Sequence, residues 1–86
     1  MWYIYVLQSK KDGNWYTGST NDLRRRLQEH NRGKDPATRE RGPWILSYYE
    51  ACRNKESTRE REKYLKTAWG KRYLRKRISN GLTPVR

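Results

Sequence analysis

The stretch WYIYVLQSKKDGNWYTG, residues 2–18, decides the fold. Its first part alternates, with Ile4 and Val6 on one side of an extended chain and Tyr5 and Leu7 on the other, which is typical of a β-strand. An Asp-Gly pair follows as a strong turn signal, and aromatic and β-branched residues then resume before the final glycine. The stretch therefore predicts an antiparallel β-hairpin.

The next segment predicts a helix and a loop. A helix over about residues 22–31 can be capped by Thr20 or Asn21, and Gly33 is placed to end it. Residues 32–43 combine glycine, proline and charged side chains, which predicts an exposed loop rather than a linker between domains.

The rest of the sequence adds one strand and more helix. Aromatic and branched residues predict a third strand over 44–51, and a long helix follows over about 54–69. Gly70 predicts a break before a last helix over about 71–80, which Gly81 closes. The predicted fold class is α/β of the α+β type: a small, mainly antiparallel three-stranded sheet flanked by helices.

Length and charge restrict the functions to consider. The 86 residues are expected to form a single domain, and 21 Lys and Arg against 9 Asp and Glu give a formal net charge of +12. Such a balance predicts a polyanionic partner, with DNA first and RNA possible. Cys52 is the only cysteine, and no apolar run approaches the roughly 18 residues of a membrane span. We expect a cytoplasmic protein, not associated with a membrane and monomeric.

Two side chains of the first helix stand out. Leu23 and Leu27 mark its buried stripe, and Arg26 and His30 lie one helical turn apart along the border of that stripe. One interpretation is an ordinary basic surface with a histidine at the edge of the core. The other is a functional pair that faces the tyrosines of the hairpin.

A carboxylate interrupts the apolar stripe of the second long helix. That stripe contains Thr58, Leu65 and Trp69, and Glu62 lies within it. Because burying an unpaired carboxylate costs several kcal/mol, Glu62 implies a cation, a hydrogen-bond network or a metal ion. The alternative is a salt bridge to Lys66 or Arg61 with the side chain tilted toward water.

These residues suit the hydrolysis of a phosphodiester bond. Arg26 offers a planar fork for phosphate oxygens, and Glu62 can hold one divalent ion, Mg²⁺ or Mn²⁺, with water completing the coordination. A tyrosine can deprotonate the attacking water if nearby positive charge lowers its pKa, and His30 can accept or relay that proton.

Two triplets and two helical segments resemble the GIY-YIG nuclease family. Tyr3-Ile4-Tyr5 corresponds to the first triplet and Tyr16-Thr17-Gly18 to the second, and residues 22–31 and 61–66 correspond to two helices of the family. The resemblance covers about residues 2–79 and is strongest to the small standalone bacterial proteins. It also extends to the nuclease domain that makes the 3′-side incision in bacterial nucleotide excision repair.

The resemblance implies a catalytic set of Tyr5, Tyr16, Arg26, His30 and Glu62, with Glu62 as metal ligand. Three positions depart from the family pattern: Tyr3 replaces a glycine, Thr17 replaces an isoleucine, and Ser19 replaces the lysine of the excision-repair members. The last departure removes a cation that could lower the pKa of a tyrosine.

The expected function is a divalent-metal-dependent endonuclease on DNA, used in repair or recombination. The alternative is a nucleic-acid-binding module of nuclease-like fold with weak or no catalysis. The cations expected to contact nucleic acid are Arg24, Lys34, Arg39, Arg41, Lys71, Arg72 and Arg75.

Overall fold

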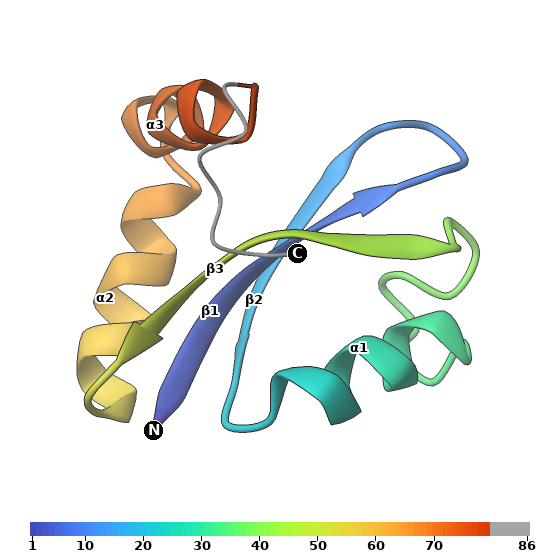
Figure 1. Cartoon of the computed structure of the whole chain (residues 1–86), viewed down its shortest axis with the longest axis horizontal. Coiled ribbons are helices and arrows are strands. Elements are labelled where there is room, and N and C mark those ends of the chain that lie inside the picture. The colour runs from blue at the N-terminus through green and yellow to red at the C-terminus, as the bar shows by residue number, and fades with distance from the viewer. Residues whose placement is uncertain (80–86) are drawn as a thin grey trace.

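A computed structural model describes residues 1–79 of the chain as three strands and three helices (Figure 1). The elements are β1 Trp2–Ser9, β2 Trp15–Thr20, α1 Leu23–Asn31, β3 Trp44–Cys52, α2 Lys55–Leu65 and α3 Ala68–Ser79. Both β2 and β3 pair antiparallel with β1, so the strand order is β2-β1-β3 and β2 is an outer strand. The predicted α+β class and antiparallel sheet are confirmed.

The alternation in β1 divides the core into two layers. Ile4 and Val6 pack with Leu65 of α2 and Leu74 of α3 on one face of the sheet. On the other face, Tyr5, Leu7 and Trp44 form a second cluster, against which Leu23 and Leu27 of α1 pack. Figure 1 shows α1 on one side of the sheet and α2 with α3 on the other.

Short polar side chains fix the connections around α1. The helix is capped by Asp22, whose carboxylate accepts from the backbone N–H of Arg25, so the prediction of Thr20 or Asn21 as cap was wrong. Gly33 follows the helix with a φ of 75°, as the predicted helix end requires. The Asn31 side chain bonds both the N–H and the C=O of Trp44, which ties the end of α1 to the start of β3.

The break between the last two helices lies earlier than predicted. Helix α2 ends at Leu65, and the Thr67 hydroxyl accepts from the backbone N–H of Gly70, so α3 already begins at Ala68. Gly70 therefore lies in the first turn of α3 instead of at the break. Trp69 was wrongly placed in the buried stripe, because the change of helix direction leaves it 67% exposed. The predicted helix end at Asn80 and Gly81 falls outside the described residues.

A half-buried ion pair ties α2 to β3. The Arg61 guanidinium donates to both carboxylate oxygens of Glu50 at 2.9 and 3.0 Å, and the Tyr48 hydroxyl donates to Glu50 at 2.6 Å. Although burial opposes the charge, Arg61 lowers the pKa of Glu50, and this carboxylate stays ionised.

No helix within residues 1–79 is long and apolar enough to cross a membrane.

Candidate active site

The position of Tyr5 depends on the strand register. Tyr5 lies opposite Gly18 in the β1–β2 pair, and its side chain points to the α1 face of the sheet. A Cβ at position 18 would lie 2.5 Å from the Tyr5 hydroxyl oxygen, closer than such contacts allow. Gly18 therefore lets the phenol ring lie directly against the backbone of β2.

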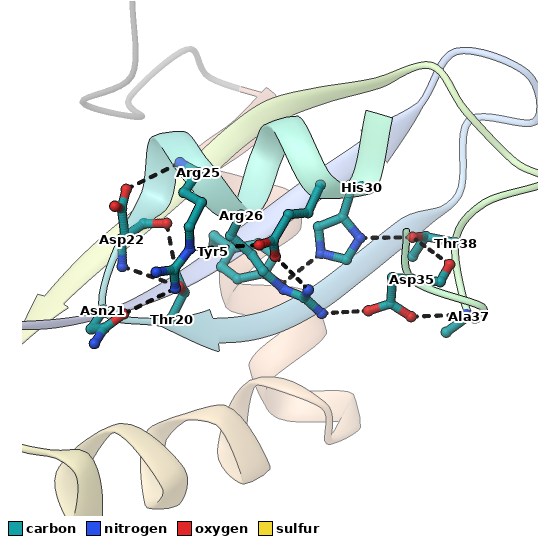
Figure 2. A network of polar contacts seen from close by, with 11 residues as sticks. Tyr5, Thr20, Asn21, Asp22, Arg25, Arg26, His30, Asp35, Ala37 and Thr38 are labelled. Carbon is teal, nitrogen blue, oxygen red and sulfur yellow. Dashed lines mark hydrogen bonds and ion pairs between the residues drawn. The ribbon is translucent and has the colours of Figure 1, made fainter. Parts of the chain in front are cut away.

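The Tyr5 hydroxyl joins two side chains of α1 (Figure 2). Its oxygen lies 2.8 Å from Nε2 of His30 and 3.3 Å from Nε of Arg26, which donates to it. Tyr5 and His30 are 2% and 1% exposed, so this contact is shielded from bulk water. Helical spacing thus brings Arg26 and His30 onto the same hydroxyl group.

Tyr16 completes the group on the same face. Its ring centroid lies 5.2 Å from that of His30 and 6.5 Å from that of Tyr5. Four of the five predicted catalytic residues, Tyr5, Tyr16, Arg26 and His30, therefore form one contact group, which we call the Tyr5 cluster.

Thr38, which no sequence pattern singled out, orients His30. Its hydroxyl oxygen lies 2.7 Å from Nδ1 of His30, and Thr38 is fully buried. The same hydroxyl donates to the backbone carbonyl of Asp35 at 3.5 Å, which leaves the Thr38 oxygen free to accept from Nδ1–H. In this tautomer Nε2 of His30 carries no proton and accepts from Tyr5 O–H.

Burial has the largest effect on the pKa values of Tyr5 and His30 in the Tyr5 cluster. Burial raises the pKa of Tyr5 to about 12, although its hydrogen bond from Arg26 and the charge of Arg26 act in the opposite direction. Burial and the charge of Arg26 both lower the pKa of His30. At neutral pH, Tyr5 is a neutral phenol beside a neutral imidazole, because the effect of burial on the Tyr5 pKa exceeds the opposing effect of Arg26. The expected net lowering of a tyrosine pKa by nearby cations therefore does not occur at Tyr5.

Two carboxylates form ion pairs with the Arg26 guanidinium. Glu29 accepts from Nη1 at 3.0 Å, and Asp35 of the 32–43 loop accepts from Nη2. Although burial opposes the charge, these contacts and Tyr5 raise the pKa of Arg26. Glu29 could have been recognised from its i, i+3 spacing to Arg26, whereas Asp35 and Thr38 come together with α1 through loop geometry that no local pattern reports.

Glu62 lies apart from these contacts, on α2 against the opposite face of the sheet. It lines a cavity of about 250 Å³ together with Ser19 of β2 and three cations, Arg59, Lys63 and Lys66. Its carboxylate forms an ion pair with Lys66 at 3.0 Å, and its side chain is 22% exposed. The structure shows the salt bridge to Lys66 within the helix, and the Glu62 side chain stays largely buried instead of tilting toward water.

The residues around Glu62 fit a divalent ion only with few protein ligands. Within residues 1–79, no three His, Cys, Asp or Glu side chains gather in a way that could hold a metal ion. One carboxylate facing an open cavity is nevertheless compatible with Mg²⁺, which keeps several water ligands. Lys66 would have to release the carboxylate when the ion binds.

The cations expected to contact nucleic acid occupy separate surfaces. Arg41, Lys71 and Arg75 line one cavity of about 500 Å³. Arg72 instead stacks over Trp69, with 5.0 Å from its guanidinium carbon to the ring centroid. The other three, Arg24, Lys34 and Arg39, are exposed around α1 and the loop that follows it.

Fold and cluster together define a small α+β domain in which the hydroxyl of one tyrosine contacts both an arginine and a histidine. The family model described as GIY-YIG catalytic domain matches residues 1–80, and the chain belongs to the GIY-YIG family. GIY-YIG domains form a nuclease superfamily, and its members generally use divalent metal ions.

Curated relatives support the same membership. The UPF0213 protein CPE1444 of Clostridium perfringens is 45% identical over 74% of this chain and 69% of its own length. The UPF0213 protein DP2720 of Desulfotalea psychrophila is 36% identical over 98% of this chain and 79% of its own length.

A solved structure agrees with the fold. The solution NMR structure of the UPF0213 protein BH0048 from Bacillus halodurans matches with a TM-score of 0.52 and 40% sequence identity. The match covers 86% of this chain and 82% of that chain.

Proposed function

We propose that the protein is a divalent-metal-dependent endonuclease that hydrolyses DNA phosphodiester bonds, in DNA repair or recombination, with Tyr5, Tyr16, Arg26, His30 and Glu62 as its catalytic set. The observation that carries the proposal is the buried Tyr5 hydroxyl, which lies between Nε2 of His30 and Nε of Arg26. A stabilising role alone does not require a phenol, an imidazole and a guanidinium on one oxygen atom.

The geometry supports a proton relay rather than a phenolate base. With a pKa of about 12, Tyr5 keeps its proton at neutral pH. As water attacks phosphorus, one water proton passes to the Tyr5 oxygen while the Tyr5 proton passes to Nε2 of His30. The net result is hydroxide bonded to phosphorus and an imidazolium at His30, which the Thr38 oxygen stabilises through Nδ1–H.

Stabilisation of the developing negative charge is assigned to Arg26 and Glu62. Arg26 would exchange its carboxylate partners for phosphate oxygens and so offset the charge that develops on the phosphate. A divalent ion held by Glu62 would supply positive charge for the departing oxygen. Tyr16 packs against His30 and would restrict the imidazole to its working orientation.

Plasmid nicking tests the proposal. Supercoiled DNA is incubated with the protein in Mg²⁺, Mn²⁺ or EDTA, beside Glu62→Gln and Arg26→Lys, which keeps the charge but loses the planar fork. Glu60→Gln, an exposed glutamate of α2, is the matched control for Glu62. We expect metal-dependent nicking that falls at least about 100-fold in the first two variants and is retained in the control. Equal nicking by all forms would indicate contamination and refute the proposal.

One observation favours a second candidate, a nucleic-acid-binding module with weak or no catalysis. Arg26 is paired with two carboxylates, Glu62 is paired with Lys66, and Ser19 supplies no cation. Salt-sensitive DNA binding without metal-dependent nicking in the same assay would select this alternative.

A further inference from the structure

Three cavities follow the outer strand β2 where it faces α2 and α3. The cavity of about 500 Å³ between the hairpin turn and α3 shares Trp15 and Lys71 with a second of about 330 Å³. The second shares Lys66 with the cavity of about 250 Å³ that contains Glu62. Because neighbouring cavities share lining residues, they follow one another along β2, and we call this row of three cavities the β2 track.

The β2 track is strongly basic. Its lining cations are Arg41, Lys71 and Arg75 at one end, Lys66 in the middle, and Arg59 and Lys63 at the other end. Among the described residues that line it, Glu62 is the only acid. Within residues 1–79, none of Arg41, Lys71 and Arg75 forms an ion pair with a carboxylate. Lys71 and Arg75 are therefore available to phosphate groups, whereas Arg41 also stacks over Trp44, with 5.1 Å from its guanidinium carbon to the ring centroid.

The track also contains an aromatic platform. Trp15 is half-buried, packs against the core cluster of Ile4 and Leu74, and lines both the first and the second cavity. A ring fixed on one side and open on another suits stacking of a nucleic-acid base. The first cavity is also within the size range of small-ligand sites.

The track connects this platform to the proposed active site. Tyr16 lines the middle cavity and also contacts His30 in the Tyr5 cluster, while Glu62 lines the far cavity. A strand lying in the track would therefore pass from Trp15 along Tyr16, the member of the Tyr5 cluster that lines the track, to Glu62.

We infer that the β2 track binds an unpaired strand of DNA, with one base stacked on Trp15 and adjacent phosphates on Lys71 and Arg75. Bases within a duplex are already stacked on their neighbours and cannot cover Trp15 in the same way. This inference rests on the proposed function and deepens it, because it makes branched or flapped DNA the preferred substrate.

Binding measured in EDTA tests the inference separately from cleavage. Fluorescence anisotropy is recorded with a labelled single strand, a blunt duplex, a duplex with an unpaired arm, and single-stranded RNA of the same sequence. Trp15→Ala is expected to weaken binding of the two unpaired DNA ligands by about 5- to 150-fold and the blunt duplex much less. Trp15→Tyr is expected to keep most of the affinity, because a tyrosine ring can also stack on a base. Trp69→Ala is the matched control, because Trp69 is exposed and does not line the track. We expect this variant to change the binding affinity by less than about twofold.

A second pair of variants avoids the core contact of Trp15. Lys71 and Lys76 are exposed lysines of α3, and Lys71 lines the track whereas Lys76 does not. Lys71→Gln is expected to weaken binding of unpaired DNA several-fold more than Lys76→Gln, with circular dichroism verifying the fold of every variant.

Three results would overturn the inference. They are an equal loss of affinity for the single strand and the blunt duplex in Trp15→Ala, equal effects of the two lysine variants, or tighter Trp15-dependent binding of RNA than of DNA.

The nicking assay separates this inference from the proposed function. Glu62-dependent nicking without Trp15-dependent binding would refute the track alone. Trp15-dependent binding without nicking would refute the nuclease and keep the track.

Discussion

Arg26 is held by groups of its own chain, although its proposed ligand is a phosphate. Glu29 of the same helix and Asp35 of the 32–43 loop both accept from its guanidinium, beside the Tyr5 hydroxyl. Asp35 is in turn fixed by the backbone N–H of Ala37, which, with Arg26, lowers the pKa of this carboxyl. An incoming phosphate must displace a carboxylate, and Asp35 is the partner that does not belong to α1.

Asp35→Asn is therefore expected to strengthen DNA binding. The substitution removes the charge that competes for Arg26 but keeps an oxygen for the Ala37 N–H, and we expect an increase in affinity of about fivefold, or roughly 1 kcal/mol. Asp12→Asn is the matched control, because Asp12 is an exposed acid of the hairpin turn and its loss changes the net charge equally. Anisotropy in EDTA measures both variants, and equal increases would show that only net charge matters.

His30 is expected to make stability depend on pH. Burial and Arg26 lower its pKa below the value of about 6.5 expected in the unfolded chain, so protonation favours unfolding. The free energy of unfolding should be fully retained above about pH 6.5 and should fall as the pH drops toward the lowered pKa. The carboxyl groups of Glu29 and Asp35, whose pKa values are also lowered, lose their contribution only at lower pH.

Urea unfolding at pH 7 and pH 5 measures this dependence. His30→Gln should be less stable than the unmodified protein at pH 7 but should lose much less stability between the two pH values. A decrease of the same size in His30→Gln would assign the pH dependence to other groups.

The junction of α2 and α3 shows how one residue sets the arrangement of two helices. A Cβ on Gly70 would lie 2.1 Å from the backbone oxygen of Tyr64 and 2.4 Å from Cα of Leu65. The first turn of α3 thus packs directly on the last turn of α2. This contact places Leu74 in the core and Lys71 on the β2 track.

Gly70→Ala is expected to destabilise the protein although alanine favours helix. The gain in helix propensity is about 1 kcal/mol, and the clash with backbone atoms, which cannot move aside, should exceed it and leave a net loss of about 2 kcal/mol or more. Ala68→Gly, at an exposed position of the same turn, is the control and should cost about 1 kcal/mol or less. Thermal unfolding measures both, and a stabilised Gly70→Ala would contradict the close contact.

Prediction from sequence succeeded where the signal is local. Alternation in β1 correctly predicted that Ile4 and Val6 face one layer and Tyr5 and Leu7 the other, because strand geometry requires only the next few residues. The break between α2 and α3 was misplaced, because Gly70 serves helix packing and not helix termination.

The candidate site was predictable to the same extent. The spacing of Arg26 and His30 indicated a shared border, and the structure places both on Tyr5. Asp35 and Thr38 could not be predicted, since they reach Arg26 and His30 through the fold of a loop. For Glu62, helical periodicity predicted a partly buried position. It did not indicate whether the partner of the carboxylate is Lys66, as in the structure, or a metal ion.

The net charge of +12 comes from cations that differ in whether a partner within the chain binds them. Arg26, Arg61 and Lys66 are paired with carboxylates, and several other cations stack on aromatic rings. The cations of the β2 track other than Lys66 form no ion pair within residues 1–79. Binding of a strand there should release counterions in proportion to the phosphates that these side chains neutralise.

The salt dependence of binding tests this distribution of charge. For about five phosphate contacts with a single strand, the slope of log K against log salt is about −3.5, and affinity falls about 100-fold between 50 and 200 mM salt. Lys71→Gln should reduce the steepness by about 0.7, because one contact is lost, whereas Lys76→Gln should leave the slope unchanged. A slope shallower than about −1 would mean that the track does not follow a phosphate backbone, and the affinity of the chain for DNA would then depend on a surface other than β2.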